Sequence, residues 1–312
     1  MPLFTYVTPQ QKQGFRTNYK YSCIDDSPLS LYITKPLWQF HAKFCPKWVA
    51  PNLLTVTGFT CTVLQFFLLS YYDYNFTEAK NKAIPAFIWY IASLFQYLSY
   101  MFDGIDGVHA RRTGTGSPLG EIMDHGFDSW TCSFTMIALY SCIGHSETFH
   151  LGLSYKDMFY MTWALQLCFY TGHWEKLISG TLYLPWSYDI SICSLIILYF
   201  VTGFIGTNAH DLIWLFEIDR YFGFENVLPF RLTSVSLLKI LYYFGSGLTI
   251  VNDIIKTLRL YAKMKREGPG PKNSKNNKIK LRNPFDLAKP WISMLAAIFL
   301  LHSWNEYSYE TI

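Results

Sequence analysis

The sequence predicts an all-α, polytopic transmembrane helical bundle of about seven spans, with an N-terminal amphipathic interfacial helix. Composition is the first observation behind it: 51% of the 312 residues are hydrophobic and 19% aromatic, whereas 15% are charged. Soluble domains usually carry roughly 25% charged residues. The second observation is that several apolar runs approach the roughly 20 residues that a helix needs to cross a bilayer. The lipid bilayer is therefore an expected partner, and no nucleic acid is expected.

Seven apolar segments are the expected spans. They lie at residues 52–72, 84–102, 118–143, 157–174, 189–207, 233–255 and 287–304. Nothing before Pro51 has the basic start and compact apolar core of a secretory signal peptide, so we expect the first span to stay in the mature protein. Ahead of it, "PLSLYITKPLWQFHAKF" mixes apolar, aromatic and basic residues, which favours an amphipathic segment at the membrane interface.

Charge divides the chain into three regions. Residues 1–50 form an N-terminal region that ends in the amphipathic helix, residues 51–262 a transmembrane core, and residues 263–312 a basic loop followed by the last span. With a cytosolic N-terminus, the lysines and arginines of the N-terminal region, Arg111, Arg112, Lys176 and the run 256–282 all fall on one side. The positive-inside rule makes that side cytosolic.

The seven cysteines are scattered singly. No CxxC pair and no His/Cys spacing suits zinc, so neither a disulfide framework nor a zinc site is expected. Small buried hydrophobic side chains are the expected role of these cysteines.

Carboxylates gather between the second and third spans, in "DGIDGVHARRTGTGSPLGEIMDHGFDSW". Asp103 and Asp106 lie three residues apart, and Asp124 and Asp128 lie four apart, so on helices each pair projects from one face. Antiparallel helices would bring the two pairs together. Four unpaired carboxylates near hydrocarbon are costly, which indicates a pair of divalent cations. Oxygen ligands favour Mg²⁺, Mn²⁺ or Ca²⁺. An ion channel or transporter is the alternative, because intramembrane carboxylates also mark ion pathways.

Small residues surround these carboxylates. Gly107, Ala110 and Gly120 would let a ligand or backbone approach closely. Arg111 lies beside them, and an arginine next to a metal pair suits the charge and hydrogen bonding of a diphosphate.

Eight of these positions reproduce the pattern DxxDGxxARx₈GxxxDxxxD with every spacing intact. This pattern resembles the signature of the CDP-alcohol phosphotransferase family. The stretches "PLSLYITKPLWQF", "WVAPNLLTVTGF" and "HWEKLISGTLYLPWSYDIS" are similar to the eukaryotic choline and ethanolamine phosphotransferases, the last to the ethanolamine branch. The resemblance covers at least residues 20–192.

The resemblance implies a reaction in which diacylglycerol, or an ether-linked diradylglycerol, attacks CDP-ethanolamine to give phosphatidylethanolamine and CMP. Residues 51–262 would be the catalytic core, in an endoplasmic reticulum or Golgi membrane with the active site facing the cytosol. Two ions, Mg²⁺ or Mn²⁺, would be held by Asp103, Asp106, Asp124 and Asp128. Gly107, Ala110, Arg111, Gly120 and Asn52 would bind the nucleotide. Asn52 could equally be a helix N-cap. The resemblance also allows a homodimer.

The identity of the catalytic base stays open between two residues. His125 is favoured because an imidazole suits proton removal near neutrality, and Asp128 is the alternative. A histidine at a membrane interface also commonly snorkels or packs. Glu121 has two interpretations, a support for the metals or an acid favoured by the helix dipole.

In "HWEK", Trp174 and Glu175 could receive an ammonium group, although an interfacial aromatic belt is favoured.

Val108 and His109 stand where close relatives would have Lys and Gln, and relatives resemble a ten-helix arrangement. Two further interpretations therefore remain beside the ethanolamine enzyme. One is a choline or dual-specificity phosphotransferase, and the other is a truncated, catalytically silent protein of the family.

Overall fold

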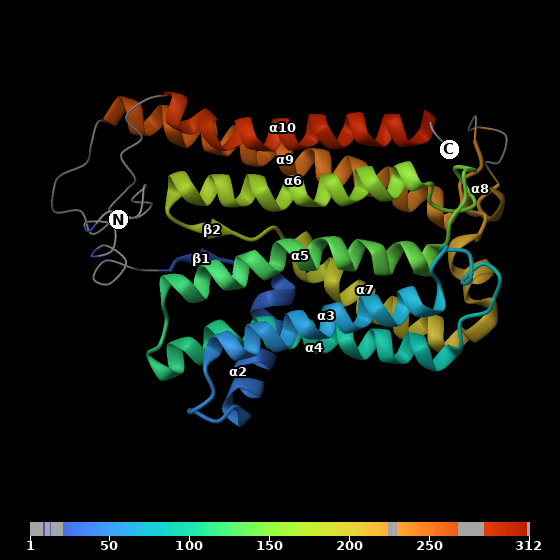
Figure 1. The fold of residues 1–312 in the computed structure, drawn as a ribbon, viewed down its shortest axis with the longest axis horizontal. Helices are drawn as coiled ribbons and strands as arrows, with labels where there is room; N and C mark the ends of the chain where they lie inside the picture. Colours follow the sequence, from blue (N-terminus) through green and yellow to red (C-terminus); the bar gives the residue numbers. More distant parts are fainter. Residues whose placement is uncertain are drawn as a thin grey trace, which may run out of the picture.

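A computed structural model describes residues 21–223, 230–267 and 284–310, together with residues 9, 13 and 227. Long helices lie side by side along the longest axis of the molecule, which is horizontal in Figure 1, and there is almost no sheet in the described chain. They are α3 (Pro51–Tyr72), α4 (Ala86–Thr113), α5 (Pro118–Ile143), α6 (Tyr155–Ser179), α7 (Ser187–Ile205), α9 (Ser234–Glu267) and α10 (Pro284–Glu310). The all-α fold is confirmed, and one long helix lies at each predicted span.

Local sequence explains where these helices begin and end. Pro51 and Pro118 stand in the first turn of α3 and α5, where a missing N–H costs nothing. The Ser117 side chain caps α5 by accepting the Gly120 N–H at 3.1 Å. The helix α4 ends at Gly114. The φ angle of this residue is +68°, a conformation that glycine adopts without strain.

Fewer helices meet a hydropathy criterion for a membrane span than lie at the predicted span positions. Within the described chain, three helices are long and apolar enough to cross a membrane, at Pro51–Tyr72, Ser187–Asn208 and Ser234–Arg266. The helix α4 carries polar residues that face protein and not lipid. Gln65 on α3 donates to the Ala92 carbonyl at 3.0 Å, and the Thr62 and Ser99 hydroxyls lie 2.7 Å apart. Polar side chains paired across α3 and α4 lower the hydropathy of a helix without exposing it to lipid.

The bundle is organised around α3 and α4. The helix α3 packs against α4 and α5, α4 also packs against α7, and α6 packs against α9. Gly58 permits the close approach of α3 to α4, because a Cβ there would lie 3.1 Å from the Phe102 Cβ. We call the end of the bundle with the α4–α5 turn, residues 114–117, the α4–α5 end. The opposite end, which carries α8 (Ile218–Tyr221), is the α8 end.

The predicted amphipathic helix is α2 (Lys35–Phe44), preceded by one π-helical turn, η1 (Ser30–Thr34). It buries Trp38 and Ala42 and exposes Phe40 and Phe44. Trp38 packs over Gly104 on α4, where an added Cβ would lie 2.5 Å from the indole nitrogen. The helix α2 is therefore anchored beside the aspartates of α4.

Short elements absent from the sequence prediction complete the described structure. The strand β1 (Cys23–Ile24) pairs in parallel with β2 (Leu182–Tyr183), which ties the N-terminal segment to the α6–α7 connection. At the α8 end, η2 (Gly206–Asn208) and η3 (His210–Trp214) follow α7. All seven cysteines are free. Residues 263–267 of the expected basic loop continue α9, and the rest of that loop lies outside the described residues.

Candidate metal centre

The two predicted pairs of aspartates meet at the α4–α5 end. One carboxylate oxygen from each of Asp103, Asp106 and Asp124 lies within 4.8 Å of the other two. The carboxyl group of Asp103 also lies against those of Asp124 and Asp128. We call these four side chains the acid cluster. The helices α4 and α5 hold them, and α3 packs against both helices.

Two hydroxyl groups hold the α4 side of the acid cluster. Thr55 on α3 donates to the Asp106 Oδ2 at 2.5 Å, and Tyr188 on α7 donates to the Asp103 Oδ2 at 3.3 Å. Neither hydroxyl was predicted from the sequence, because each comes from a helix outside the motif. Such bonds fix the direction of a carboxylate and so orient a ligand for a metal.

No lysine or arginine among the described residues forms an ion pair with the acid cluster. The described ion pairs to these carboxylates come from His125 alone, whose Nδ1 lies 3.7 Å from Asp124 and 3.6 Å from Asp128. The Asp124 Oδ1 is buried and has no hydrogen-bond partner. Like charges this close repel strongly in a partly buried site. Converging oxygen donors, one of them unpartnered, fit a pair of hard divalent cations such as Mg²⁺ or Mn²⁺.

Arg111 lies on the α4 flank of the acid cluster. The guanidinium NH1 of this exposed residue lies 3.5 Å from the position that a Cβ on Gly107 would take. Arg111 also acts electrostatically on Asp106. Ala110 directly precedes Arg111 in the last turns of α4. A cation over a glycine surface next to the carboxylates is suited to a diphosphate.

Asn52 is not a helix cap. The helix α3 begins at Pro51 with Ala50 as its N-cap residue, so Asn52 is already inside the helix. Its side chain instead crosses to α5, where Nδ2 lies 3.4 Å from the Met123 sulfur. A Cβ on Gly120 would lie 3.2 Å from the Asn52 Oδ1. The structure thus brings Asn52 and Gly120 together, and the N-cap interpretation is wrong.

His125 lies between the acid cluster and α6. Its Nδ1 faces the carboxylates of Asp124 and Asp128 without a hydrogen bond, and its Nε2 lies 3.0 Å from the Lys176 Nζ. The His173 ring packs edge-on against it with centroids 4.7 Å apart. Only 15% of the His125 side chain is exposed, and its contact with His173 agrees with the interpretation of this histidine as a packing residue.

Glu121 pairs with Lys176, a lysine that no sequence motif marks as functional. Its Oε1 lies 2.5 Å from the Lys176 Nζ, and the same ammonium lies 4.7 Å from the centre of the Tyr21 ring. Neither interpretation of Glu121, as a metal support or a helix-dipole acid, included this partner. Only the fold brings Lys176, about 50 residues further along the chain, to His125.

The neighbours of Lys176 turn away from the acid cluster. The Trp174 ring packs edge-on against Trp291 of α10, with centroids 5.2 Å apart. Glu175 lies near the charges of Lys256 and Asp253 on α9. These directions do not support an ammonium site formed by Trp174 and Glu175 beside the acid cluster.

His109, which departs from the pattern expected of close relatives, is fully buried. Its Nε2 lies 3.0 Å from the Val49 carbonyl oxygen in the α2–α3 linker. The other departure, Val108, packs with the buried residues around Trp38. The contacts of both residues therefore belong to the packing at the base of α2.

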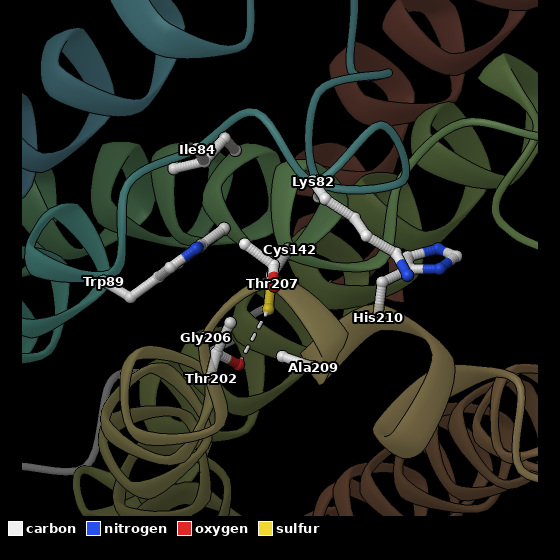
Figure 2. Close-up of a pocket in the computed structure, with 10 residues that line it drawn as sticks. Lys82, Ile84, Trp89, Cys142, Thr202, Gly206, Thr207, Ala209 and His210 are labelled. Carbon is white, nitrogen blue, oxygen red and sulfur yellow. Dashed lines mark hydrogen bonds between the residues drawn. The ribbon is translucent and has the colours of Figure 1, made fainter.

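The α8 end holds a small cavity of about 20 Å³, shown in Figure 2. Lys82, Cys142, Thr202 and His210 are among its lining residues. This volume has room for water but not for a nucleotide. The cavity therefore does not compete with the acid cluster as a substrate site.

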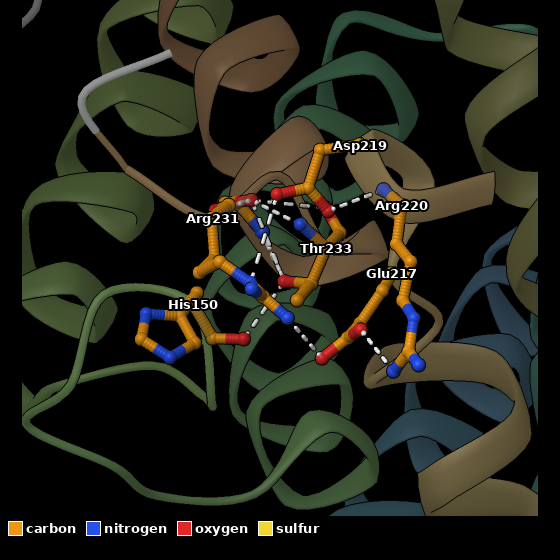
Figure 3. Close-up of polar contacts among 7 residues, drawn as sticks. His150, Glu217, Asp219, Arg220, Arg231 and Thr233 are labelled. Carbon is orange, nitrogen blue, oxygen red and sulfur yellow. Dashed lines mark hydrogen bonds and ion pairs between the residues drawn. The ribbon is translucent and has the colours of Figure 1, made fainter. Parts of the chain in front are cut away.

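Figure 3 shows a second group of charged residues at the α8 end, which we call the α8-end charge cluster (Glu217, Asp219, Arg220 and Arg231). The Arg231 NH2 lies 2.7 Å from Glu217 and its Nε 3.7 Å from Asp219. Arg220 adds a contact of 3.5 Å to Glu217. Thr233 donates to the His150 carbonyl at 2.7 Å, which joins this cluster to the α5–α6 connection.

Comparison with known proteins assigns the part of the chain that carries the acid cluster to a protein family. Residues 48–207 match the CDP-alcohol phosphatidyltransferase family. The chain is 33% identical over 303 residues to human ethanolaminephosphotransferase 1, which covers 96% of the chain and 69% of the relative. The mouse ethanolaminephosphotransferase 1 is 41% identical over 208 residues, 66% of the chain and 51% of the relative. Yeast (Saccharomyces cerevisiae) cholinephosphotransferase 1 is 28% identical over 299 residues, 95% and 71% respectively.

Proposed function

Because the chain belongs to the CDP-alcohol phosphatidyltransferase family, we propose that it transfers phosphoethanolamine from CDP-ethanolamine to diacylglycerol or an ether-linked diradylglycerol. The products are phosphatidylethanolamine and CMP. The observation that carries the proposal is the convergence of four carboxylates inside the segment that matches the family, with no ion pair to a lysine or arginine among the described residues. The higher identity to the human ethanolaminephosphotransferase than to the yeast cholinephosphotransferase supports ethanolamine as the headgroup.

The proposed reaction exchanges one phosphorus–oxygen bond for another. The lipid hydroxyl oxygen bonds to the β-phosphorus, which carries the ethanolamine. The bond from that phosphorus to the oxygen bridging the two phosphates breaks, and CMP leaves with the electron pair. The hydroxyl proton must pass to a base. Asp103, Asp106, Asp124 and Asp128 would hold two divalent ions. The positive charge of these ions would offset the negative charge of the diphosphate and of the attacking and leaving oxygens.

The side chains around the acid cluster have separate proposed roles. Arg111 would pair with a phosphate through its guanidinium fork. Gly107, Ala110 and Gly120 would let the nucleotide approach the backbone, and Asn52 would bind it from α3. His125 would accept the hydroxyl proton because its ring borders the acid cluster on the α6 side. Asp128 remains the alternative base.

The proposed location is the endoplasmic reticulum or Golgi membrane, with the acid cluster facing the cytosol. Lysines and arginines gather at the α4–α5 end, at Arg111, Arg112, Lys176 and the end of α9. That asymmetry supports a cytosolic α4–α5 end. A homodimer is part of the same proposal, and light scattering of the purified protein in detergent would measure it.

A headgroup competition tests the proposal. Purified protein in lipid is incubated with diacylglycerol and equal amounts of CDP-ethanolamine and CDP-choline, each carrying a different label. We expect labelled phosphatidylethanolamine as the main product. Labelled phosphatidylcholine in equal or larger amount would instead support the choline or dual-specificity alternative, which similarity to the yeast cholinephosphotransferase also favours. No phospholipid and no CMP would support the catalytically silent alternative.

A further inference from the structure

The imidazole of His125 is held by α6 through one ammonium group. The Lys176 Nζ lies 3.0 Å from the His125 Nε2 and 2.5 Å from the Glu121 Oε1. Glu121 and His125 are four residues apart on α5, so both project from one face of that helix. Lys176 therefore joins α6 to two side chains of α5 at the edge of the acid cluster.

This contact determines which nitrogen of His125 carries its hydrogen. A lysine ammonium has three donors and no acceptor, so Nε2 must be the accepting nitrogen. A neutral imidazole then carries its hydrogen on Nδ1. That nitrogen lies 3.7 Å from the Asp124 carboxylate and 3.6 Å from the Asp128 carboxylate, so it is the nitrogen on the side of the acid cluster.

The surroundings of Lys176 restrict where its ammonium can go. Only 15% of its side chain is exposed. Glu121 neutralises its charge on one side, and the face of the Tyr21 ring lies 4.7 Å away on another. A carboxylate and an aromatic ring thus keep the ammonium at the edge of the acid cluster, and Nε2 of His125 is its remaining close partner.

We infer that Lys176 is a positioning residue for His125. It fixes the ring plane and the Nδ1–H form, and it occupies the place at Nε2 from which the acceptor hydroxyl would deliver its proton. Glu121 keeps the ammonium nearby when the hydroxyl takes that place. This inference rests on the proposed function, because it gives Lys176 its effect through a base that the proposal assigns.

Measuring kcat and KM for variants of Lys176 and His125, singly and together, distinguishes a positioning role of Lys176 from other roles. We expect Lys176→Met to lower kcat by about tenfold or more, because misplacing a base costs rate, while KM for CDP-ethanolamine changes less than about threefold. Lys176→Arg keeps a cationic donor and is expected to restore most of kcat. Lys47→Met, an exposed lysine in the α2–α3 linker, controls for the loss of one positive charge.

The same substitution is then made in His125→Ala. If Lys176 acts through the imidazole, Lys176→Met lowers kcat in this background by less than about twofold. An equally large drop there, or a large rise in KM with kcat unchanged, overturns the inference, because Lys176 would then act on the substrate or the fold. If His125→Ala itself leaves kcat unchanged, the base in the proposed function is wrong, whatever Lys176 does.

A measurement without turnover tests the same contact. In protein labelled with ¹⁵N-histidine, the signals lost in His125→Ala identify His125. We expect the wild-type ring to show the Nδ1–H form and Lys176→Met to lose that preference, with Lys176→Arg like the wild type. A ring whose hydrogen lies on Nε2 in the wild type, or whose signals are the same in Lys176→Met, overturns the inference even if the variants fold less stably.

Discussion

The two ends of the bundle each hold a group of charged side chains, and the two groups are built differently. In the α8-end charge cluster, Glu217 and Asp219 lie within ion-pair distance of Arg231, and Arg220 adds a further contact to Glu217. In the acid cluster, four carboxylates converge, and the described residues offer them ion pairs only from His125. In the described residues, the carboxylates of the first group are paired with arginines and those of the second are not.

This difference separates a structural contact from a candidate binding site. Charges that are paired within the protein need no ligand, and their pairing ties α8 to the segment just before α9. Carboxylates brought together without cations are costly near hydrocarbon, so the fold maintains an arrangement that a bound cation would stabilise. The acid cluster is therefore where we expect substitutions to change turnover, and the α8-end charge cluster is where we expect them to change stability.

Removing divalent cations should have the largest effect on phosphoethanolamine transfer, because the acid cluster is expected to bind them and the α8-end charge cluster is not. We expect excess chelator to abolish phosphoethanolamine transfer and Mg²⁺ or Mn²⁺ to restore it, because the proposed ions neutralise the diphosphate. Product formation before and after metal addition measures this. Full activity in excess chelator would mean that the carboxylates serve another purpose.

Substitutions of single aspartates should affect turnover in the acid cluster and stability in the α8-end charge cluster. Asp106→Asn and Asp124→Asn are each expected to lose nearly all turnover while the protein still inserts into membranes, because each removes a charged ligand. Asp219→Asn, in the α8-end charge cluster, is the matched control. We expect it to keep turnover and to lower the free energy of unfolding by about 1–3 kcal/mol, since an amide replaces a buried partner of Arg231.

Turnover and thermal unfolding in detergent are measured for all three variants. If Asp106→Asn and Asp219→Asn lost turnover equally, the distinction between the clusters would fail. If Asp124→Asn stayed active, the acid cluster would be structural as well.

His125→Ala should have a smaller effect than loss of a metal ligand. We expect kcat to fall by roughly 10²- to 10⁴-fold, the usual contribution of a positioned base, while CDP-ethanolamine binding stays near wild type. Steady-state kinetics together with nucleotide binding measure the two quantities separately. A variant that loses metal would show that His125 supports the geometry of the acid cluster, and an unchanged kcat would favour Asp128 as the base.

The smallest expected effect concerns the nucleotide. In Gly120→Ala the new Cβ would lie 3.2 Å from the Asn52 Oδ1, so the amide must shift by a few tenths of an ångström. We expect KM for CDP-ethanolamine to rise by about 2- to 10-fold with kcat nearly unchanged, because ground-state contacts are altered. A change confined to kcat would place Asn52 and Gly120 in the chemical step instead.

The sequence predicts the helices and the acid cluster for the same physical reason. Apolar runs and carboxylates at spacings of three and four follow helical geometry, so residue spacing alone places Asp103, Asp106, Asp124 and Asp128 on two helix faces. Contacts between distant helices leave no such periodic trace. Lys176 reaches His125, and Tyr188 reaches Asp103, only because α6 and α7 return to the α4–α5 end.

Asn52 shows the same limit at short range. A helix N-cap was one of its two expected roles, but the helix begins at Pro51 and the Asn52 side chain turns toward α5. The short strands β1 and β2 were also missed, because a pair of two-residue strands carries no alternating pattern.

Direct metal binding tests the central claim that the uncompensated carboxylates form the site. Purified wild-type protein, Asp124→Asn and Asp219→Asn are titrated with Mn²⁺, and free Mn²⁺ is followed by electron paramagnetic resonance. We expect two ions per wild-type chain, as the proposed pair of ions requires, fewer or weaker ions in Asp124→Asn, and wild-type binding in Asp219→Asn. A wild-type protein that binds no Mn²⁺, or an Asp124→Asn variant that binds it as the wild type does, would contradict the account.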